Sequence, residues 1–345
     1  MVDTLRTHVK GILTRYPDWE SHLVGFHVES ELMVGNWDEV QKLVRDRDNH
    51  ASSVLIAQLL LALRSEDTSA VTNALSKARL SLGSPIVAAG PRGYRRSYDA
   101  VLDLHLVHEL ETIHRIASAQ KAGRGEYDLS VLSSALTSRL NSTLPTFRTQ
   151  EPILNMRRIA FSLMYYRFLF FCSYANSRIS STSNREIREV IGDSWLTTAK
   201  IARKAGHWQT AYSAMLQAQQ CKVVSCFLES ARLVRASGEH LRALQELENY
   251  MRSAGMLGQE KEPPDDVIDL TDEKIGPNIT AKVWITFAYV TLRLTTCQAQ
   301  LLRARWMSEA DRYEPTYILS AFHEAVKSAD KYGVSLIAHN GCCMS

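Results

Sequence analysis

Apolar and small residues in the middle of the chain recur at the spacing of helical turns. One stripe consists of Trp195, Ala199, Ala202 and Ala205, at steps of four and three. A second stripe consists of Ala211, Ala214, Met215 and Ala218. Residues at these steps share one face of a helix, and faces made of alanine let two backbones approach closely. The pattern therefore predicts two short helices packed as a tight hairpin.

The residues between the two stripes predict where the chain turns. Arg203 and Lys204 stand two and three residues before Gly206, with Lys204 the nearer. Cations followed by a residue that readily adopts positive φ are typical of a helix end. Thr210 is then a candidate N-cap for the second helix. We expect the two helices to be joined at Gly206.

The same design returns one repeat later. Gly238 takes the place of Gly206 in the second copy. Phe227, Ala231 and Ala243 stand 32 residues after Trp195, Ala199 and Ala211, as Gly238 stands after Gly206. Small residues that recur with a turn glycine at a fixed distance indicate a repeated helical hairpin.

Weaker copies of the hairpin occur near the start of the chain. Gly35, Asn36 and Trp37 stand in the order of Gly206, His207 and Trp208. A further hairpin pattern follows, with its turn at residues 65–67. Repeats of about 34 residues are the tetratricopeptide period, and such repeats bury their apolar faces only by stacking on neighbours. The chain is therefore predicted to be an all-α solenoid of tetratricopeptide-like hairpins; the alternative is an irregular all-α domain in which similar hairpins coincide.

Composition agrees with one helical array along 345 residues. Alternating β-branched strands are scarce, and the nine prolines gather in a few linkers. We predict a helical array over residues 1–258, an acidic loop flanked by prolines over 259–280, continuing helices of the array over 281–332, and an atypical tail over 333–345. A truncated or mis-spliced gene is our leading explanation for that tail.

The charge of the chain is nearly balanced but unevenly placed. Forty basic and 37 acidic residues leave +3, too small an excess to favour nucleic-acid binding. Residues 260–274 contain seven acids and two lysines, a balance of −5, so the remainder carries +8. We expect no direct contact with nucleic acid.

Nothing in the sequence favours a membrane or an oxidising compartment. The first twenty residues lack a long apolar stretch and a small-residue cleavage site. The most apolar run, residues 159–175, is short for a membrane span and carries Arg167, so a buried helix is the better interpretation. The six cysteines form no CxxC and no regular ligand set with histidines. We predict an intracellular protein with no disulfide, no zinc and no membrane contact.

Three strings of the sequence resemble the FAT region of phosphatidylinositol-3-kinase-related protein kinases. They are "WLTTAKIARKAGHWQTAY", "EPILNMRRIAFSL" and "GYRRSYDAVLDLHLVHELE", and the resemblance covers roughly residues 20 to 325. Among these kinases the chain is most similar to the ATR-type DNA-damage checkpoint kinases, with a fungal-like character. The motif residues, to which the resemblance gives a structural role, are Glu151, Pro152, Arg157, Arg158, Trp195, Ala202, Arg203, Lys204, Gly206, His207, Gln209, Ala211 and Tyr212.

The resemblance implies a scaffold. In this family the FAT region is an α-solenoid that curls around a serine/threonine kinase domain, supports its activation elements and contributes to subunit association. It further implies a nuclear protein of the DNA-damage response that a partner subunit recruits, with ATP and magnesium used only by the kinase domain. This chain departs from the whole kinase, because it carries no Gly-rich phosphate loop, no catalytic Asp followed by a metal-binding Asn, and no DFG.

Two classes of function stay open. The first is the regulatory part of a checkpoint kinase, which partners with a kinase domain, with the neighbouring solenoid and with a second copy. The second is a free-standing tetratricopeptide adaptor that binds peptides. An enzyme acting alone ranks last, and we expect no catalytic, cofactor or metal site in this chain.

Several polar clusters are candidate sites. His105, His108, Glu109 and His114 occur in "LHLVHELETIH". Neighbours in sequence point in different directions on a helix, and the string is not HExxH, so a metal site is not favoured. His207 is expected at an exposed helix end. Arg157 and Arg158 have the chemistry to grip a phosphate, but a structural role between helices is favoured. The basic string at residues 91–98 has the chemistry to touch nucleic acid, but a solvated loop is preferred.

The acidic segment contains one short apolar island. Its residues, Val267, Ile268, Asp269 and Leu270, look like a SUMO-interacting motif of the "VIDLT" type. Such motifs add a strand to a sheet edge, and their flanking acids meet lysines on the partner. The alternative is an acidic linker that only keeps a loop soluble.

Overall fold

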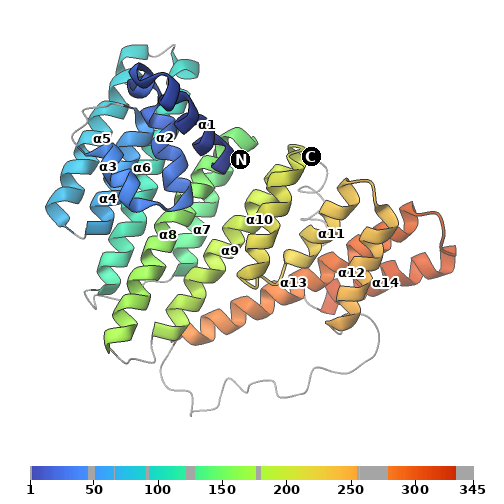
Figure 1. The fold of residues 1–345 in the computed structure, drawn as a ribbon. Helices are drawn as coiled ribbons and strands as arrows, with labels where there is room; N and C mark the ends of the chain where they lie inside the picture. The colour runs from blue at the N-terminus through green and yellow to red at the C-terminus, as the bar shows by residue number, and fades with distance from the viewer. Residues whose placement is uncertain are drawn as a thin grey trace. The chain divides into compact units, whose positions relative to one another are not determined.

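The computed structural model describes residues 2–45, 51–65, 67–90, 93–121, 129–175, 180–254, 256 and 279–331. Within these ranges every regular element is a helix (Figure 1). The chain divides into two compact units, residues 1–191 and 192–345. The boundary falls inside one long helix. The prediction of an all-α fold is confirmed.

The first unit is a succession of packed helices. They are α1 Val2–Arg15, the 3₁₀ turn Pro17–Trp19, α2 Glu20–Val34, α3 Trp37–Val44, α4 Ser52–Ser65, α5 Thr68–Ala89, α6 Tyr94–Lys121, α7 Leu129–Asn141, α8 Phe147–Ala175 and the start of α9 Ser180–Lys204. Helix α1 packs on α2, α2 on α3 and α4, α4 on α5, α5 on α6, and α6 on α8. These helices thus pack against the next helix or the next but one in the sequence, as stacked hairpins do.

Local sequence explains the boundaries of these helices. Helix α4 has the apolar run Val54 to Leu63, and Leu59 and Leu60 are fully buried. Its successor begins after Asp67, whose carboxylate accepts a hydrogen bond from the backbone N–H of Ser69 at 2.9 Å. This is an N-cap, which satisfies a backbone donor that the helix itself cannot.

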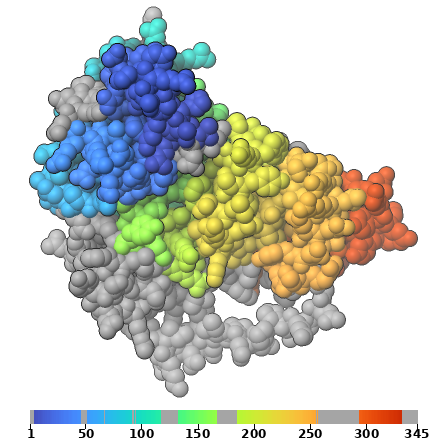
Figure 2. All heavy atoms as spheres, in the orientation of Figure 1, coloured from blue at the N-terminus to red at the C-terminus, as the bar shows by residue number. Residues whose placement is uncertain are grey.

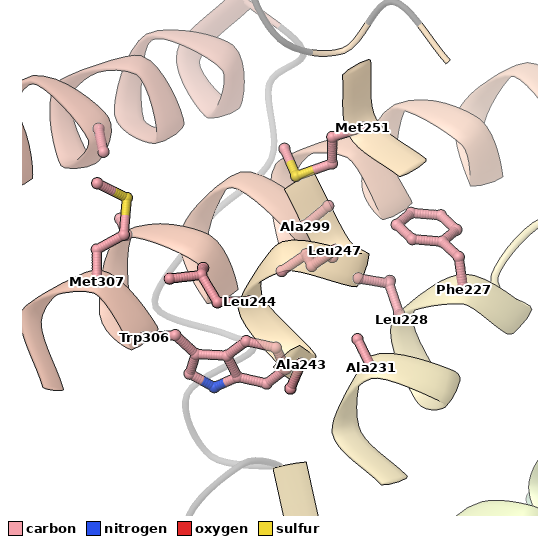
Figure 3. Packing of buried hydrophobic residues seen from close by; sticks show 12 residues of the cluster. Phe227, Leu228, Ala231, Ala243, Leu244, Leu247, Met251, Ala299, Trp306 and Met307 are labelled. Carbon is pink, nitrogen blue, oxygen red and sulfur yellow. The ribbon is translucent and has the colours of Figure 1, made fainter. Parts of the chain in front are cut away.

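The second unit continues the pattern. It contains the end of α9, then α10 Trp208–Gln220, α11 Cys226–Ala236, α12 His240–Ser253, α13 Ile279–Glu309 and α14 Pro315–Lys331. Helix α10 packs on α11, α11 on α12, α12 on α13, and α13 on α14. The residues that form its main core are Phe227, Leu228, Ala231, Ala243, Leu244, Leu247, Met251, Ala299, Ala304, Trp306, Met307 and Ala321 (Figure 3).

The three glycine turns that the sequence predicts have one geometry. Gly35, Gly206 and Gly238 adopt φ of 80°, 77° and 96°. Each glycine N–H donates to the carbonyl three residues earlier, at 3.1, 3.1 and 3.0 Å. The residue two places after each glycine starts the next helix and donates back to the glycine carbonyl, at 3.0, 3.1 and 3.1 Å. These are αL helix caps of the Schellman kind, so the repeat register is confirmed.

Packing obeys the same register. Five residues after the three glycines stand Val40, Ala211 and Ala243, each with no exposed surface. Seven residues before them stand Val28, Ala199 and Ala231, at most 1% exposed. The copied positions are therefore buried on both helices of each hairpin, and Ala231 and Ala243 belong to one core cluster.

Three predictions about the hairpin around Gly206 were wrong. Thr210 is not an N-cap, because α10 already begins at Trp208, directly after the turn residue His207. Ala205 is exposed, because α9 ends at Lys204 and Ala205 has turned out of the stripe. The first helix of the pair is not short, since α9 has 25 residues.

The predicted divisions of the chain at residues 258, 280 and 332 stay predictions. Most of the acidic segment and the tail lie outside the described residues. The apolar run at 159–175 forms the end of α8, where Phe161 and Met164 are buried. None of the helices in the described ranges has the length and apolar character needed to cross a membrane.

Candidate functional site

The "ARKAGH" motif builds the turn between α9 and α10. Gly206 supplies the positive φ, and the backbone N–H of His207 donates to the carbonyl of Ala202 at 2.9 Å. Ala202 and Ala211 are completely buried on the two sides of the turn. Lys204 and His207 are exposed. Most of the motif thus shapes a tight hairpin.

Arg203 has a different role from the other residues of this motif. Its Nε donates to Oε1 of Glu229 at 2.6 Å, and Glu229, in α11, is only 1% exposed. Arg232 also approaches Glu229, at 3.4 Å. The motif arginine therefore ties the end of α9 to the next hairpin.

The equivalent arginine one repeat later makes a similar contact. Arg235 takes the place of Arg203 in the second copy of the hairpin and pairs with Glu309 of α13. Its guanidinium also lies 4.8 Å from the centre of the Trp306 ring, a cation–π distance. Both arginines close the first helix of a hairpin and bind a carboxylate from the following hairpin. These contacts form a ladder along the second unit.

The "EPILxxRR" motif lies within α8. Ile153 and Leu154 are buried in the core of the first unit. Arg157 is buried as well and donates through Nε and Nη2 to the two carboxylate oxygens of Glu109, both at 2.6 Å. Its Nη2 also donates to the carbonyl of Leu136 at 2.8 Å. One side chain thus connects α8 with α6 and α7.

The neighbouring pair is weaker. Nη2 of Arg158 lies 3.2 Å from Oε1 of Glu151, which belongs to the same helix. Burial lowers the pKa of Arg158 to about 10. Burial also raises the pKa of Glu151, an effect that the positive charge of Arg158 only partly offsets. Pro152 lies between them in the first turns of the helix. The structural role favoured for Arg157 and Arg158 agrees with these contacts.

The histidines of "LHLVHELETIH" do not converge. Nε2 of His105 lies 3.1 Å from Oε1 of Glu109, whose two oxygens also accept from Arg157. His108 instead lies beside Glu111, with 3.7 Å between Nδ1 and Oε2, and beside Arg139. Among the described residues no three His, Cys, Asp or Glu side chains are placed to hold a metal ion.

The remaining predicted residues are divided between core and surface. Trp195 is partly buried against the cluster that joins α9 to α10. Gln209 and Tyr212 are exposed on α10. The solvated loop preferred for the basic string is wrong for residues 94–98, which form the first turns of α6. Arg95 and Arg96 are exposed there, and Ser97 is buried. Val267, Ile268, Asp269 and Leu270 lie outside the described residues.

The two family motifs lie in different units, "EPILxxRR" in the first and "ARKAGH" in the second. Each motif supplies the arginine of a buried ion pair, and sequence reasoning paired neither arginine with its carboxylate. Glu109 and Glu229 lie 48 and 26 residues from their arginines. Glu109 lies within the quoted string "LHLVHEL", but nothing local distinguishes a carboxylate that will be buried from an exposed one.

Residues 27–333 match the FAT domain family, so the chain belongs to that family. Its relatives include the serine/threonine-protein kinase ATR of Arabidopsis thaliana, 26% identical over 264 residues, which are 72% of this chain and 9% of the relative. The ATR kinase of Oryza sativa subsp. indica is 24% identical over 257 residues (69% and 9%). That of Drosophila melanogaster is 28% identical over 248 residues (70% and 10%).

These matches confirm the resemblance to the FAT region of an ATR-type kinase. The chain spans about a tenth of the length of the curated relatives it matches. The matched region is the FAT region alone. The fungal-like character stays a prediction.

Proposed function

We propose that this chain is the non-catalytic regulatory scaffold of an ATR-type serine/threonine checkpoint kinase that acts in the DNA-damage response. The observation that carries the proposal is the family match over residues 27–333, together with ATR relatives of which it covers about a tenth. In this role the array packs around a kinase domain and supports it. A nuclear location follows from the same role.

The buried ion pairs suit a scaffold. Arg157 and Arg203 each fix one helix to another through a buried carboxylate. Breaking such a pair leaves an uncompensated charge in the interior, so the helices keep their relative positions. A rigid array is what a partner domain needs from its support.

The chemistry belongs to the kinase domain, which uses ATP and magnesium. We expect the purified chain to transfer no phosphate from ATP to a protein substrate above the level of buffer. The matched control is the same preparation after an additional step that removes contaminating kinases. Turnover that survives this step, at an unchanged rate per chain, contradicts the proposal.

The partner prediction is tested with the gene itself. Genomic DNA downstream of the codon for Ser345 should contain a frame that encodes a kinase domain. Co-expressed with this chain, that domain should co-purify with it and show higher kinase activity than alone. A kinase frame whose product neither binds the chain nor responds to it argues against scaffolding.

The second candidate is a free-standing tetratricopeptide adaptor, which the repeated hairpins favour. Absence of a kinase frame would support it. A recruiting subunit and a second copy remain proposed partners of the scaffold, and neither nucleic acid nor membrane is a proposed partner.

SUMO is a further proposed partner, through residues 267–270. Labelled SUMO titrated with the wild-type chain should bind weakly and in a salt-sensitive way. The triple variant Val267→Ala, Ile268→Ala, Leu270→Ala is the control. Equal signals from both chains remove the idea.

A further inference from the structure

Arginines that join helices in the second unit are held by a carboxylate and an aromatic ring together. The guanidinium of Arg235, in α11, lies 4.8 Å from the centre of the Trp306 ring and pairs with Oε2 of Glu309. The other oxygen of Glu309, Oε1, accepts from Nε of Arg305, four residues earlier on α13, at 2.9 Å. One carboxylate thus takes an arginine of its own helix on one oxygen and an arginine of another helix on the other.

Arg303 of α13 is held by the same two kinds of group. Its Nε donates to Oε1 of Glu248, in α12, at 2.9 Å. Its guanidinium lies 5.8 Å from the centre of the Tyr317 ring, and Nη2 donates to the Tyr317 hydroxyl at 3.1 Å. A charge-assisted hydrogen bond and a cation–π contact act together on one planar group. This combination is therefore how the second unit binds a guanidinium.

Helix α12 carries the same groups without the second arginine. Oε1 of Glu246 accepts from Nε of Arg242, four residues earlier, at 3.1 Å, as Oε1 of Glu309 accepts from Arg305. Among the described residues, Oε2 of Glu246 has no hydrogen-bond partner. Tyr250 stands one turn after Glu246 on the same side of the helix and is 39% exposed. An open carboxylate oxygen and an accessible aromatic ring thus lie close together.

Glu246 and Tyr250 line one hollow, which has a volume of about 330 Å³. Phe227 lines it as well and stacks on Tyr250, with 4.0 Å between ring centres and 9° between ring planes, so the tyrosine ring is supported from one side. Figure 2 shows the light orange part of the chain, which includes α12, at the surface of the face drawn. A side chain of a partner can therefore reach the hollow from solvent.

The charge of the hollow selects its occupant. Among the described residues that line it, only Glu246 is charged. Val223 and Val224, from the turn between α10 and α11, give the wall an apolar part. A long side chain with an apolar stem and a positive end matches both features.

We propose that this hollow binds the side chain of an arginine from a partner polypeptide. The guanidinium donates to Oε2 of Glu246 and stacks on the ring of Tyr250, in the way that Arg235 meets Glu309 and Trp306. Arginine suits the hollow better than lysine, because a flat guanidinium can stack on a ring while it donates in its own plane. The partner is defined by this chemistry alone, so the proposal does not depend on the kinase role.

Two labelled peptides serve as probes. One is Ala-Leu-Arg-Leu-Ala, and in the other citrulline replaces the arginine, which keeps the shape of the side chain but removes its charge. Each is titrated with the full chain and followed by fluorescence anisotropy. The arginine peptide should bind at least about tenfold more tightly, because only a guanidinium makes the ion pair and the cation–π contact. Glu246→Gln should abolish this preference.

Glu239→Gln is the matched control, because Glu239 also accepts from Arg242, at 2.8 Å, but does not line the hollow. It should leave the preference unchanged. Tyr250→Leu should weaken binding of the arginine peptide by about two- to thirtyfold, whereas Tyr250→Phe keeps the ring and should retain most of the affinity.

Three results would overturn the proposal. Equal binding of the arginine and citrulline peptides by the wild-type chain assigns the hollow to an apolar occupant. The same loss of preference in the Glu239→Gln and Glu246→Gln variants reduces the effect to net charge. No saturable binding of the arginine peptide by a wild-type chain whose helical fold circular dichroism confirms leaves the hollow without this ligand.

Discussion

Replacing Arg157 by methionine should destabilise the first unit more than any surface change. The variant keeps an unbranched apolar stem but removes the guanidinium group and its three hydrogen bonds, two at 2.6 Å to Glu109 and one at 2.8 Å to the carbonyl of Leu136. Glu109 is 1% exposed, so its carboxylate would stay in the interior without its guanidinium. Removing one partner of such a pair costs about 3 to 5 kcal/mol.

That loss is a large part of the whole stability, since domains are stable by about 5 to 15 kcal/mol. The double variant Arg157→Met, Glu109→Leu removes both charges together. It should recover at least half of the loss, because a buried ion pair replaced by apolar side chains is often neutral. Strong non-additivity of the two changes is therefore expected.

The assay is urea unfolding followed by far-ultraviolet circular dichroism, with hydrogen exchange of α6 and α8 peptides to locate the effect. Arg185→Met is the matched control. Arg185 pairs with Glu189 at 3.0 Å, but its side chain is 80% exposed, so its loss should cost about 0 to 1 kcal/mol. If the Arg157 and Arg185 variants unfold at the same urea concentration, the reasoning about the buried pair is refuted.

Three further predictions concern other features of the array. Burial alone would raise the pKa of Glu31, but hydrogen bonds from Lys10, Arg6 and Asn36 outweigh it and lower this pKa to about 2. The stability that the Glu31 carboxylate contributes is therefore full above about pH 4.5 and disappears as pH falls toward 2. Acid titration of the wild type should show this loss of stability, and Glu31→Gln should make the stability depend less on pH. Ala211→Leu and Ala243→Leu should each overpack a closed hairpin and cost about 1 to 3 kcal/mol, measured by thermal melting; unchanged curves for both would contradict the register. Gly206→Ala should cost about 1 to 2 kcal/mol, because φ of 77° is strained for a residue with a Cβ, while Gly206→Asn should cost less; equal losses from the two would argue against a backbone cause.

Features that depend on residues within one or two helical turns of each other could be predicted from the sequence. The glycine at each turn, the basic residues before it and the alanines on either side are all local. They predicted the turn at Gly206, the buried stripes around it and its copy at Gly238. Thr210 failed as a cap because an αL turn starts the next helix two residues after the glycine. A helix can begin there without a side-chain cap.

The acidic partners of the motif arginines could not be predicted. Glu109 and Arg157 stand on different helices, and only the packing of α6 against α8 brings them together. The sequence around Glu109 resembles that around many other carboxylates, and nothing in it marks the one that will be buried.

The ladder of arginines bears on how this family tolerates insertions. The first rung, Arg203 to Glu229, spans 26 residues, and the second, Arg235 to Glu309, spans 74. The second is longer because residues 254–278 stand between α12 and α13, and because Glu309 is the last residue of α13 whereas Glu229 lies in the first turn of α11. Each rung joins residues that are neighbours in space, and the entropy of closing a flexible connection grows only slowly with its length. Doubling such a loop costs only about 0.6 kcal/mol. Relatives can therefore differ widely in the length of this segment while the hairpins on either side keep the same register.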